Sequence, residues 1–242
     1  RVTVGMIGGR HAFTTTSGAT TAAVPRHIDV YGIAQGMTNT AWDTHEEGEY
    51  INFRGVTAVG CRNGAIKHRS PNSTIIEPVV RNTLGIGIRI APTAIGSTLH
   101  GGELRDIRYL SEGSPGVGVQ IEATDVTLGG DPRIDCDDQA VLVLTGADRA
   151  RIRSGSFTAG RRGEAATNTA IEFQGTSTGH RVDRGVAIEA GATGVKVAAG
   201  VTDVRVDPIR YGTVTTRAVG DMHQIAAPNR RKLVSIPQGT VR

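Results

Sequence analysis

The chain has 242 residues with a net charge of +4, 4% aromatic residues and 33 glycines, and its apolar residues occur in short runs of Val, Ile, Leu and Ala. This composition suits many short strands. No apolar run reaches the roughly 18 residues of a membrane span. The basic clusters are too short and too poor in aromatics to indicate nucleic-acid binding. Two cysteines, Cys61 and Cys136, are too few for a disulfide scaffold or a zinc site. We therefore expect no membrane insertion, no nucleic acid, no cofactor and no metal.

The first 25 residues do not share the pattern that follows them. The chain opens on Arg1 in mid-pattern and lacks the basic, apolar, small-residue order of a signal peptide. We expect residues 1–25 to be an N-terminal cap or a connection to a preceding segment. The basic clusters at 161–162 and 230–232 stand in polar stretches with Gly or Pro and are predicted to be surface loops.

A repeat of 22 to 31 residues begins after residue 26. One type of short alternating strand recurs, and we align its central residues at Ile66, Ile88, Val119, Leu142, Ile171 and Val195. A second strand type keeps the same pace at residues 50–53, 73–76, 98–104, 125–128, 149–152 and 203–206. Glycines and β-branched residues between the strands exclude a helix in each unit, so the repeat predicts a β-solenoid.

The spacing of these strands resembles that of the right-handed parallel β-helices of the pectate-lyase-like superfamily. The likeness covers about residues 26–210 and depends on pattern, not on an invariant motif. It implies an all-β, right-handed parallel β-helix of about eight coils over residues 26–212, with residues 213–242 as a C-terminal cap, a linker or the start of another domain. A sandwich or barrel is the rival fold, but the only Asn-Gly or Asp-Gly hairpin signal is Asn63-Gly64. About three coils would separate the two cysteines, so both should be free thiols.

Side chains alternate inward and outward along a strand, so the alignment predicts which face each residue occupies. Ile66, Ile88, Val119, Ile171 and Val195 should face the core, and their successors, among them Lys67 and Arg89, should face outward. One coil earlier, the same register turns Asp43 and His45 outward and Trp42 and Thr44 inward. The stretch "AWDTHEEGEY" (41–50) then lies on a lateral face beside Lys67 and Arg89.

The residues Asp43-Thr44-His45-Glu46 resemble the Asp-Pro-His-Glu motif of mannuronan C5-epimerases. Two differences are that Thr44 replaces the proline and that Trp42 stands near the position at which that family has a catalytic tyrosine. The resemblance implies proton transfer by His45, with Asp43 as its orienting partner and Lys67 or Arg69 as the cation that neutralises a sugar carboxylate. The candidate catalytic residues are Asp43, His45, Lys67 and His68, and the candidate substrate-binding residues are Trp42, Glu46, Arg69 and Arg89. The structural alternative for residues 43–48 is a polar turn, and that for His68 is a buried, hydrogen-bonded core residue. The aromatic side chains of Trp42, Tyr31 and Tyr50 either stack on sugars or cover the first coils.

Other polar groups in the sequence are weaker candidates. Asp135, Asp137 and Asp138 in "RIDCDDQ" are expected to form a solvated acidic turn, with Ca²⁺ binding as the alternative. His100 and Glu103 flank a double glycine and would share one face of a bulge. A glycosidase would need two carboxylates, for which Asp43 with Glu46 or Glu77 is one choice.

Two classes of function fit this pattern. The first is a β-helical segment of a bacteriophage tailspike or tail fibre, which the repeat resembles in style. It would be a virion structural protein that binds a bacterial surface polysaccharide, forms a homotrimer, contacts other tail proteins and lies in the virion tail. The alternative is an enzyme acting on a surface glycan, namely a polysaccharide lyase, a uronate epimerase or a glycosidase. A secreted adhesin is a third option, with a secreted location in place of the virion tail.

Overall fold

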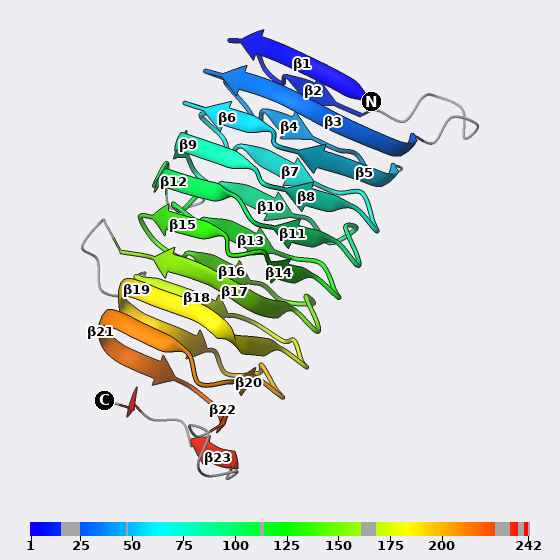
Figure 1. Ribbon diagram of the computed structural model, residues 1–242. Helices are drawn as coiled ribbons and strands as arrows, with labels where there is room; N and C mark the ends of the chain where they lie inside the picture. Colours follow the sequence, from blue (N-terminus) through cyan, green and yellow to red (C-terminus); the bar gives the residue numbers. More distant parts are fainter. Residues whose placement is uncertain are drawn as a thin grey trace.

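The computed structural model describes residues 1–15, 25–46, 48–111, 114–160, 168–225, 233–236 and 240–241. In these residues the chain is all β, with short parallel strands stacked into a solenoid of about eight turns (Figure 1). The expected parallel β-helix is therefore confirmed, and the right-handed winding stays a prediction. The described part of the chain holds no helix long and apolar enough to cross a membrane.

Each complete coil presents three faces, which the chain visits in a fixed order. Face 1 holds β2 (Phe13–Thr14), β4 (Trp42–Asp43), β7 (Ile66–His68), β10 (Ile88–Ile90), β13 (Val119–Ile121), β16 (Val141–Val143) and β18 (Thr169–Phe173). Face 2 holds β5 (Glu49–Arg54), β8 (Thr74–Ile76), β11 (Thr98–His100), β14 (Thr127–Gly129), β20 (Arg205–Val206) and β22 (Met222–Ile225). Face 3 holds β1 (Val2–Ile7), β6 (Thr57–Val59), β9 (Val79–Leu84), β12 (Glu103–Arg108) and β15 (Arg133–Cys136).

Four longer strands continue from one face to the next. These are β3 (Arg26–Gln35), β17 (Arg151–Thr158), β19 (Arg181–Val197) and β21 (Arg210–Val219). Parallel pairing starts at β1 with β3 and continues to β21 on β19, so the repeat extends on both sides of residues 26–212. Beyond it, β23 (Leu233–Ile236) and β24 (Thr240–Val241) pair antiparallel with β22 and β21.

The corners between faces are columns of residues in the left-handed conformation. Register places eight of them in line between faces 1 and 2, all with φ from 52° to 76°: His27, Tyr50, Asn72, Gly96, Asp125, Arg149, Gly179 and Asp203. Two shorter columns make the other corners: Gly55, Glu77, Gly101 and Gly130, then Gly8, Gly36, Gly60, Asn82 and Asp106. Gly, Asn and Asp enter this region at the least cost, which explains why the chain is rich in glycine.

The core is a set of inward ladders that run through the coils. On face 1 the ladder joins Ile66, Ile88, Val119, Val141, Ile171 and Val195, all of them buried. This confirms the predicted inward positions of the ladder except at one coil. There the predicted equivalent, Leu142, is wrong by one residue: it faces outward beside Gln120, and Val141 takes its place. The run Val-Leu-Val-Leu has no polar alternation, so the period of two cannot fix its register.

The prediction of two strand types was also incomplete, because each coil has three. The expected single strand at 98–104 is divided at Gly101-Gly102 into β11 and β12. Only two residues separate the strands at such a corner, so the sequence pattern merges them. The predicted set of the second strand type also lacked one coil, because the strand containing Val182 lies between those of Ile152 and Val206.

The cysteines and basic clusters give two further outcomes. Cys61 and Cys136 are buried free thiols, as predicted. The clusters at 161–162 and 230–232 lie outside the described residues.

Candidate functional site

The strand β4 fixes the direction of every side chain in the stretch "WDTH". Trp42 pairs with Ile66 and Asp43 with Lys67, as the predicted register required. Trp42 and Thr44 point inward and are 0% exposed, and the Trp42 Nε1–H donates to the Thr57 carbonyl at 3.2 Å. Because the ring lies in the core, Trp42 offers no surface on which a sugar could stack.

Asp43 points outward but is held by a neighbouring cation. Arg69 Nη2 lies 2.8 Å from Oδ1 and 2.7 Å from Oδ2 of Asp43, and Arg69 Nε donates to Oδ1 at 3.2 Å. Both side chains are largely buried, so the pair is a well-formed charge-assisted contact. The carboxylate that was expected to orient His45 is thus engaged by Arg69.

His45 and Glu46 lie at the end of this stretch. His45 is half-buried, and its backbone is fixed on both sides: its N–H donates to Thr15 Oγ1 at 2.7 Å, and its carbonyl accepts from Ser70 Oγ at 2.9 Å. The side chain of Glu46 is exposed. These backbone contacts make the stretch an ordered corner of the coil.

His68 lies in the core and pairs with Ile90 of the next coil in the inward column. Its ring is 0% exposed and meets Phe53 edge-on, with centroids 5.9 Å apart. Neither ring nitrogen has a well-formed hydrogen bond, and the one polar contact of the ring is a weaker one with the Ser70 backbone, so the expected burial is confirmed and the expected hydrogen bond is present only in this weaker form. Burial lowers the pKa of His68 to about 4, against a smaller opposite effect of the Ser70 backbone. His68 cannot reach a substrate at the surface.

Lys67 and Arg89 are cross-strand neighbours on face 1, both half-buried and outward. Arg89 pairs with Glu122 through two hydrogen bonds of 2.7 and 2.9 Å. Lys67 makes no hydrogen bond or ion pair with a described residue. Burial lowers the pKa of Lys67, and the nearby Arg69 and Arg89 add to that effect while Asp43 and Glu122 oppose it.

These two cations line a pocket of about 200 Å³ at the corner between faces 3 and 1. The pocket brings together residues of four successive coils, and more than 20 positions of sequence separate each coil from the next. The remaining lining residues, which sequence reasoning missed, are Asn39, Thr40, Asn63, Gly64, Ile66, Ile86 and Ser114. One signal was available: Asn39 and Asn63 are one coil apart and precede equivalent strands.

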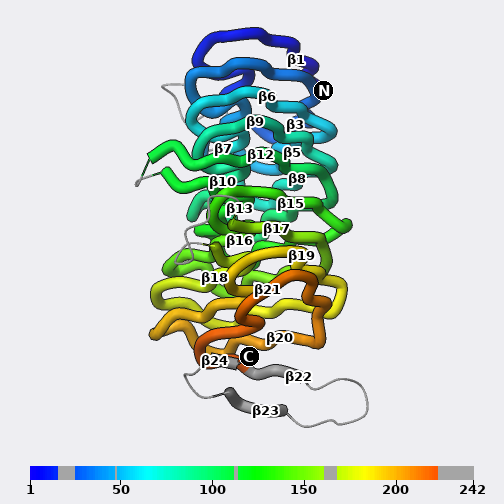
Figure 2. Tube along the Cα trace, turned by 90° about the vertical axis from the view of Figure 1, so that its left-hand side faces the viewer, coloured from blue at the N-terminus to red at the C-terminus, as the bar shows by residue number. Residues whose placement is uncertain are grey.

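The wall carrying Ser114 belongs to the segment between β12 and β13, which projects from the stack in green in Figure 2. Two carboxylates anchor its base: Asp137 Oδ2 accepts from the Tyr109 N–H at 2.9 Å, and Asp138 Oδ2 accepts from the Gly116 N–H at 2.7 Å. Asp138 is 1% exposed, so the predicted solvated acidic turn is wrong there. The turn holds a loop instead of facing solvent, because buried backbone N–H groups need acceptors.

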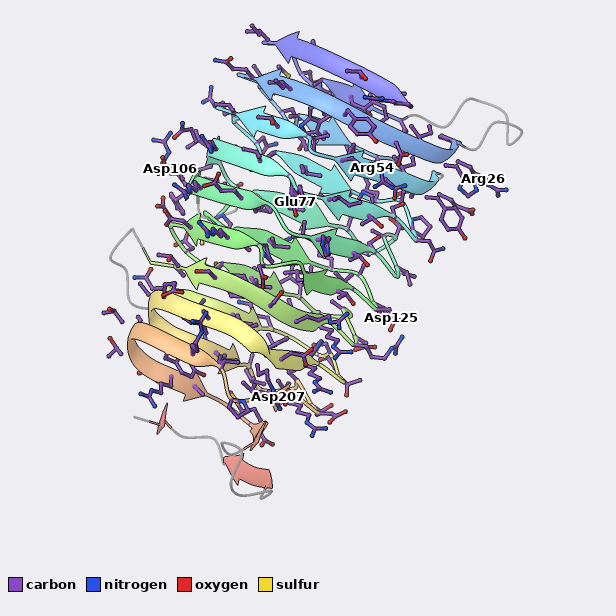
Figure 3. The ribbon with its side chains drawn as sticks, in the orientation of Figure 1. Arg26, Arg54, Glu77, Asp106, Asp125 and Asp207 are labelled. Carbon is purple, nitrogen blue, oxygen red and sulfur yellow. The ribbon has the colours of Figure 1, made fainter. Side chains whose placement is uncertain are left out.

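A second hollow of about 320 Å³ lies at the corner between faces 2 and 3 and is lined by Glu77, Glu103, Asp131 and Arg133 among others. Figure 3 labels Glu77, whose side chain lies on the outside of the coils. Glu103 pairs with Arg81 at 2.8 Å and with Arg105. The hydrogen bond from Arg81 is the main reason that the pKa of Glu103 is lowered.

Two further findings complete the description of the site. Among the described residues, no group of three or more His, Cys, Asp or Glu side chains is placed to hold a metal ion. Comparison of the chain with family models, curated proteins and solved structures found no match.

Proposed function

We propose that this chain is a β-helical segment of a bacteriophage tailspike or tail fibre that binds a bacterial surface polysaccharide. The observation that carries the proposal is the polar pocket on the side of the solenoid, which Lys67 and Arg89 line together with Asn39 and Asn63. Amides and cations of this kind bind hydroxyl and carboxylate groups. Its volume, about 200 Å³, is below the 300–1,000 Å³ typical of drug-sized ligands, which fits one sugar residue of a chain that runs along the stacked coils.

The surroundings of the predicted catalytic residues favour binding over lyase or epimerase chemistry. The carboxylate of Asp43 is paired with Arg69, and His68 is buried in the core. Only His45 and Lys67 of the four candidates remain accessible to a ligand in this structure. Proton transfer would need an acid and a base at one sugar carbon, and these two residues lack an orienting carboxylate.

A binding assay with a blocking variant tests this function. Ser114→Phe places an aromatic ring in the pocket wall, and Thr98→Phe places the same ring on face 2 as a control. Over a panel of bacterial surface polysaccharides, the wild type and Thr98→Phe should bind the same glycan, while Ser114→Phe should lose at least tenfold in affinity. Equal binding by all three proteins would refute this site, and binding to no glycan of the panel would count against the function.

The second hollow favours one enzymatic alternative, a glycosidase. Glu77 and Glu103 line the same hollow, and a pair of carboxylates is what glycoside hydrolysis requires. In this alternative Glu103, kept ionised by Arg81 and Arg105, is the base or nucleophile and Glu77 is the acid. The release of reducing ends from a bound polysaccharide, and its loss in Glu77→Gln, would support hydrolysis. A bound polysaccharide that keeps its length would exclude it.

A further inference from the structure

The charges around Lys67 do not balance. Five charged side chains meet on this part of face 1: Asp43, Lys67, Arg69, Arg89 and Glu122. Arg69 holds the carboxylate of Asp43, and Arg89 holds that of Glu122. Three cations thus face two carboxylates, and Lys67 is the cation left over.

The position of Lys67 makes this excess charge costly. Lys67 stands directly between Asp43 and Arg89 in the outward column, and like charges on paired residues repel. Its pKa is lowered, chiefly by burial and then by Arg69. Asp43 and Glu122 act in the opposite direction, but both carboxylates are hydrogen-bonded to arginines, so no described carboxylate forms an ion pair with Lys67. An anion in the pocket would supply that counter-charge.

The lining of the pocket also includes neutral hydrogen-bonding groups that contact one another. Asn63 Nδ2 donates to Asn39 Oδ1 at 3.1 Å, and the same Oδ1 accepts from the Thr40 N–H at 2.9 Å. These bonds fix the planes of both amides, and they leave Asn39 Nδ2 as a donor and Asn63 Oδ1 as an acceptor. A donor beside an acceptor is suited to sugar hydroxyls, which need both.

The remaining wall is apolar and close to the backbone. Ile86 lines the pocket, and Gly64, with φ +97°, stands beside it. A Cβ at Gly64 would lie 2.7 Å from the Ile86 carbonyl oxygen, so only glycine fits there. The pocket therefore combines one uncompensated cation, a pair of fixed amides and an apolar surface.

We propose that this pocket binds a single carboxylate-bearing sugar residue, with Lys67 facing the carboxylate, Asn39 and Asn63 facing ring hydroxyls, and Ile86 facing the C–H surface of the ring. The inference rests on the proposed polysaccharide-binding function and adds the class of sugar. A neutral sugar would leave Lys67 without a counter-charge. A simple anion such as sulfate would leave the Asn63 Oδ1 acceptor and the apolar wall unused.

Calorimetric titration of the intact chain at constant ionic strength tests this proposal, with sodium D-glucuronate, D-glucose and sodium sulfate as probes. Glucuronate should bind at least tenfold more tightly than glucose or sulfate. Lys67→Gln should weaken glucuronate binding at least tenfold. Lys196→Gln is the matched control: Lys196 lies in the same outward column but is paired with Glu172 at 2.8 Å, so its removal should change affinity less than twofold.

A second variant separates recognition of the sugar from attraction of any anion. Asn63→Ala should weaken glucuronate binding and leave the weak sulfate binding unchanged. Glucuronate should also raise the pKa of Lys67, which NMR of the lysine side chain can follow. Sulfate binding as tight as glucuronate binding, or equal effects of Lys67→Gln and Lys196→Gln, would overturn the proposal.

The outcomes also separate this inference from the function on which it rests. If glucuronate binds as described but no surface polysaccharide does, the proposed function fails and the pocket chemistry stands. If a polysaccharide binds and Ser114→Phe abolishes the binding, but glucuronate neither binds nor competes, the inference fails alone.

Discussion

His68 offers the sharpest test of how the core and the surface are assigned. It is fully buried, neither of its ring nitrogens has a well-formed hydrogen bond, and its column neighbour is Ile90. An unsatisfied buried polar group costs about 1–3 kcal/mol. His68→Leu would continue the aliphatic column without that cost, so the free energy of unfolding at pH 7 should rise by about that amount.

The same residue predicts how stability depends on pH. The pKa of His68 falls from 6.5 in the unfolded chain to about 4 in the folded protein, so the unfolded state binds the proton more tightly. The contribution of His68 to stability is complete above pH 6.5 and is lost as the pH falls towards 4. By linkage the loss is about 2 kcal/mol at pH 5 and about 3 kcal/mol at pH 4. His68→Leu should remove this part of the acid sensitivity.

His180 is the matched control, because burial lowers its pKa to about 4 as well. Unlike His68 it is hydrogen-bonded through both ring nitrogens: Nδ1 accepts from the Ala150 N–H at 3.3 Å, and Nε2 lies 2.9 Å from Ser177 Oγ. His180→Leu should also flatten the acid response, yet it should cost about 1–3 kcal/mol at pH 7 by leaving the Ala150 N–H unpaired.

Urea unfolding followed by circular dichroism between pH 4 and pH 7.5 measures both effects. Carboxylates with lowered pKa values, such as Glu103, add their own loss of stability near pH 4, because the unfolded chain is protonated there before the folded protein is, so the contribution of His68 is taken as the difference between wild type and variant at each pH. If His68→Leu were as destabilising as His180→Leu, the assignment of His68 as an unsatisfied core residue would be refuted. An unchanged pH slope in both variants would refute the linkage.

Three further predictions concern the core, the thiols and the assembly. Ile88→Asp buries an unpaired charge and should cost several kcal/mol or abolish folding by thermal denaturation. Arg89→Ala, at the outward neighbour, should cost less, about 1–3 kcal/mol, because it leaves the carboxylate of Glu122 without its main partner; equal tolerance of the two changes would disprove the register. Cys61 and Cys136 are buried, and desolvation raises the pKa of both thiols. A thiol reagent should therefore label both only in denaturant, and labelling of the native protein would contradict their placement. We also expect a homotrimer, because β1 pairs with no described strand but β3 and its last residue, Ile7, is 84% exposed. Light scattering that showed a monomer at micromolar concentration would exclude it.

The sequence alone determined the architecture and most of the register. The period of two along each strand sorts residues such as Ile88 and Arg89 into core and surface, since only one side of a solenoid strand meets the apolar interior. That rule also placed Asp43 opposite Lys67 across a coil. It failed at Leu142, where an unbroken apolar run removes the alternation that sets the register.

Only the tertiary structure decided what surrounds each polar residue. Whether Asp43 is free or held by Arg69 depends on the path of the next coil, which places residues 26 positions apart in contact. The pocket likewise needs Asn39, Asn63, Lys67 and Ser114 from successive coils and a projecting loop, and no local pattern links them. Local alternation follows from the geometry of one strand, but a site made by stacking depends on the length and direction of every corner in between.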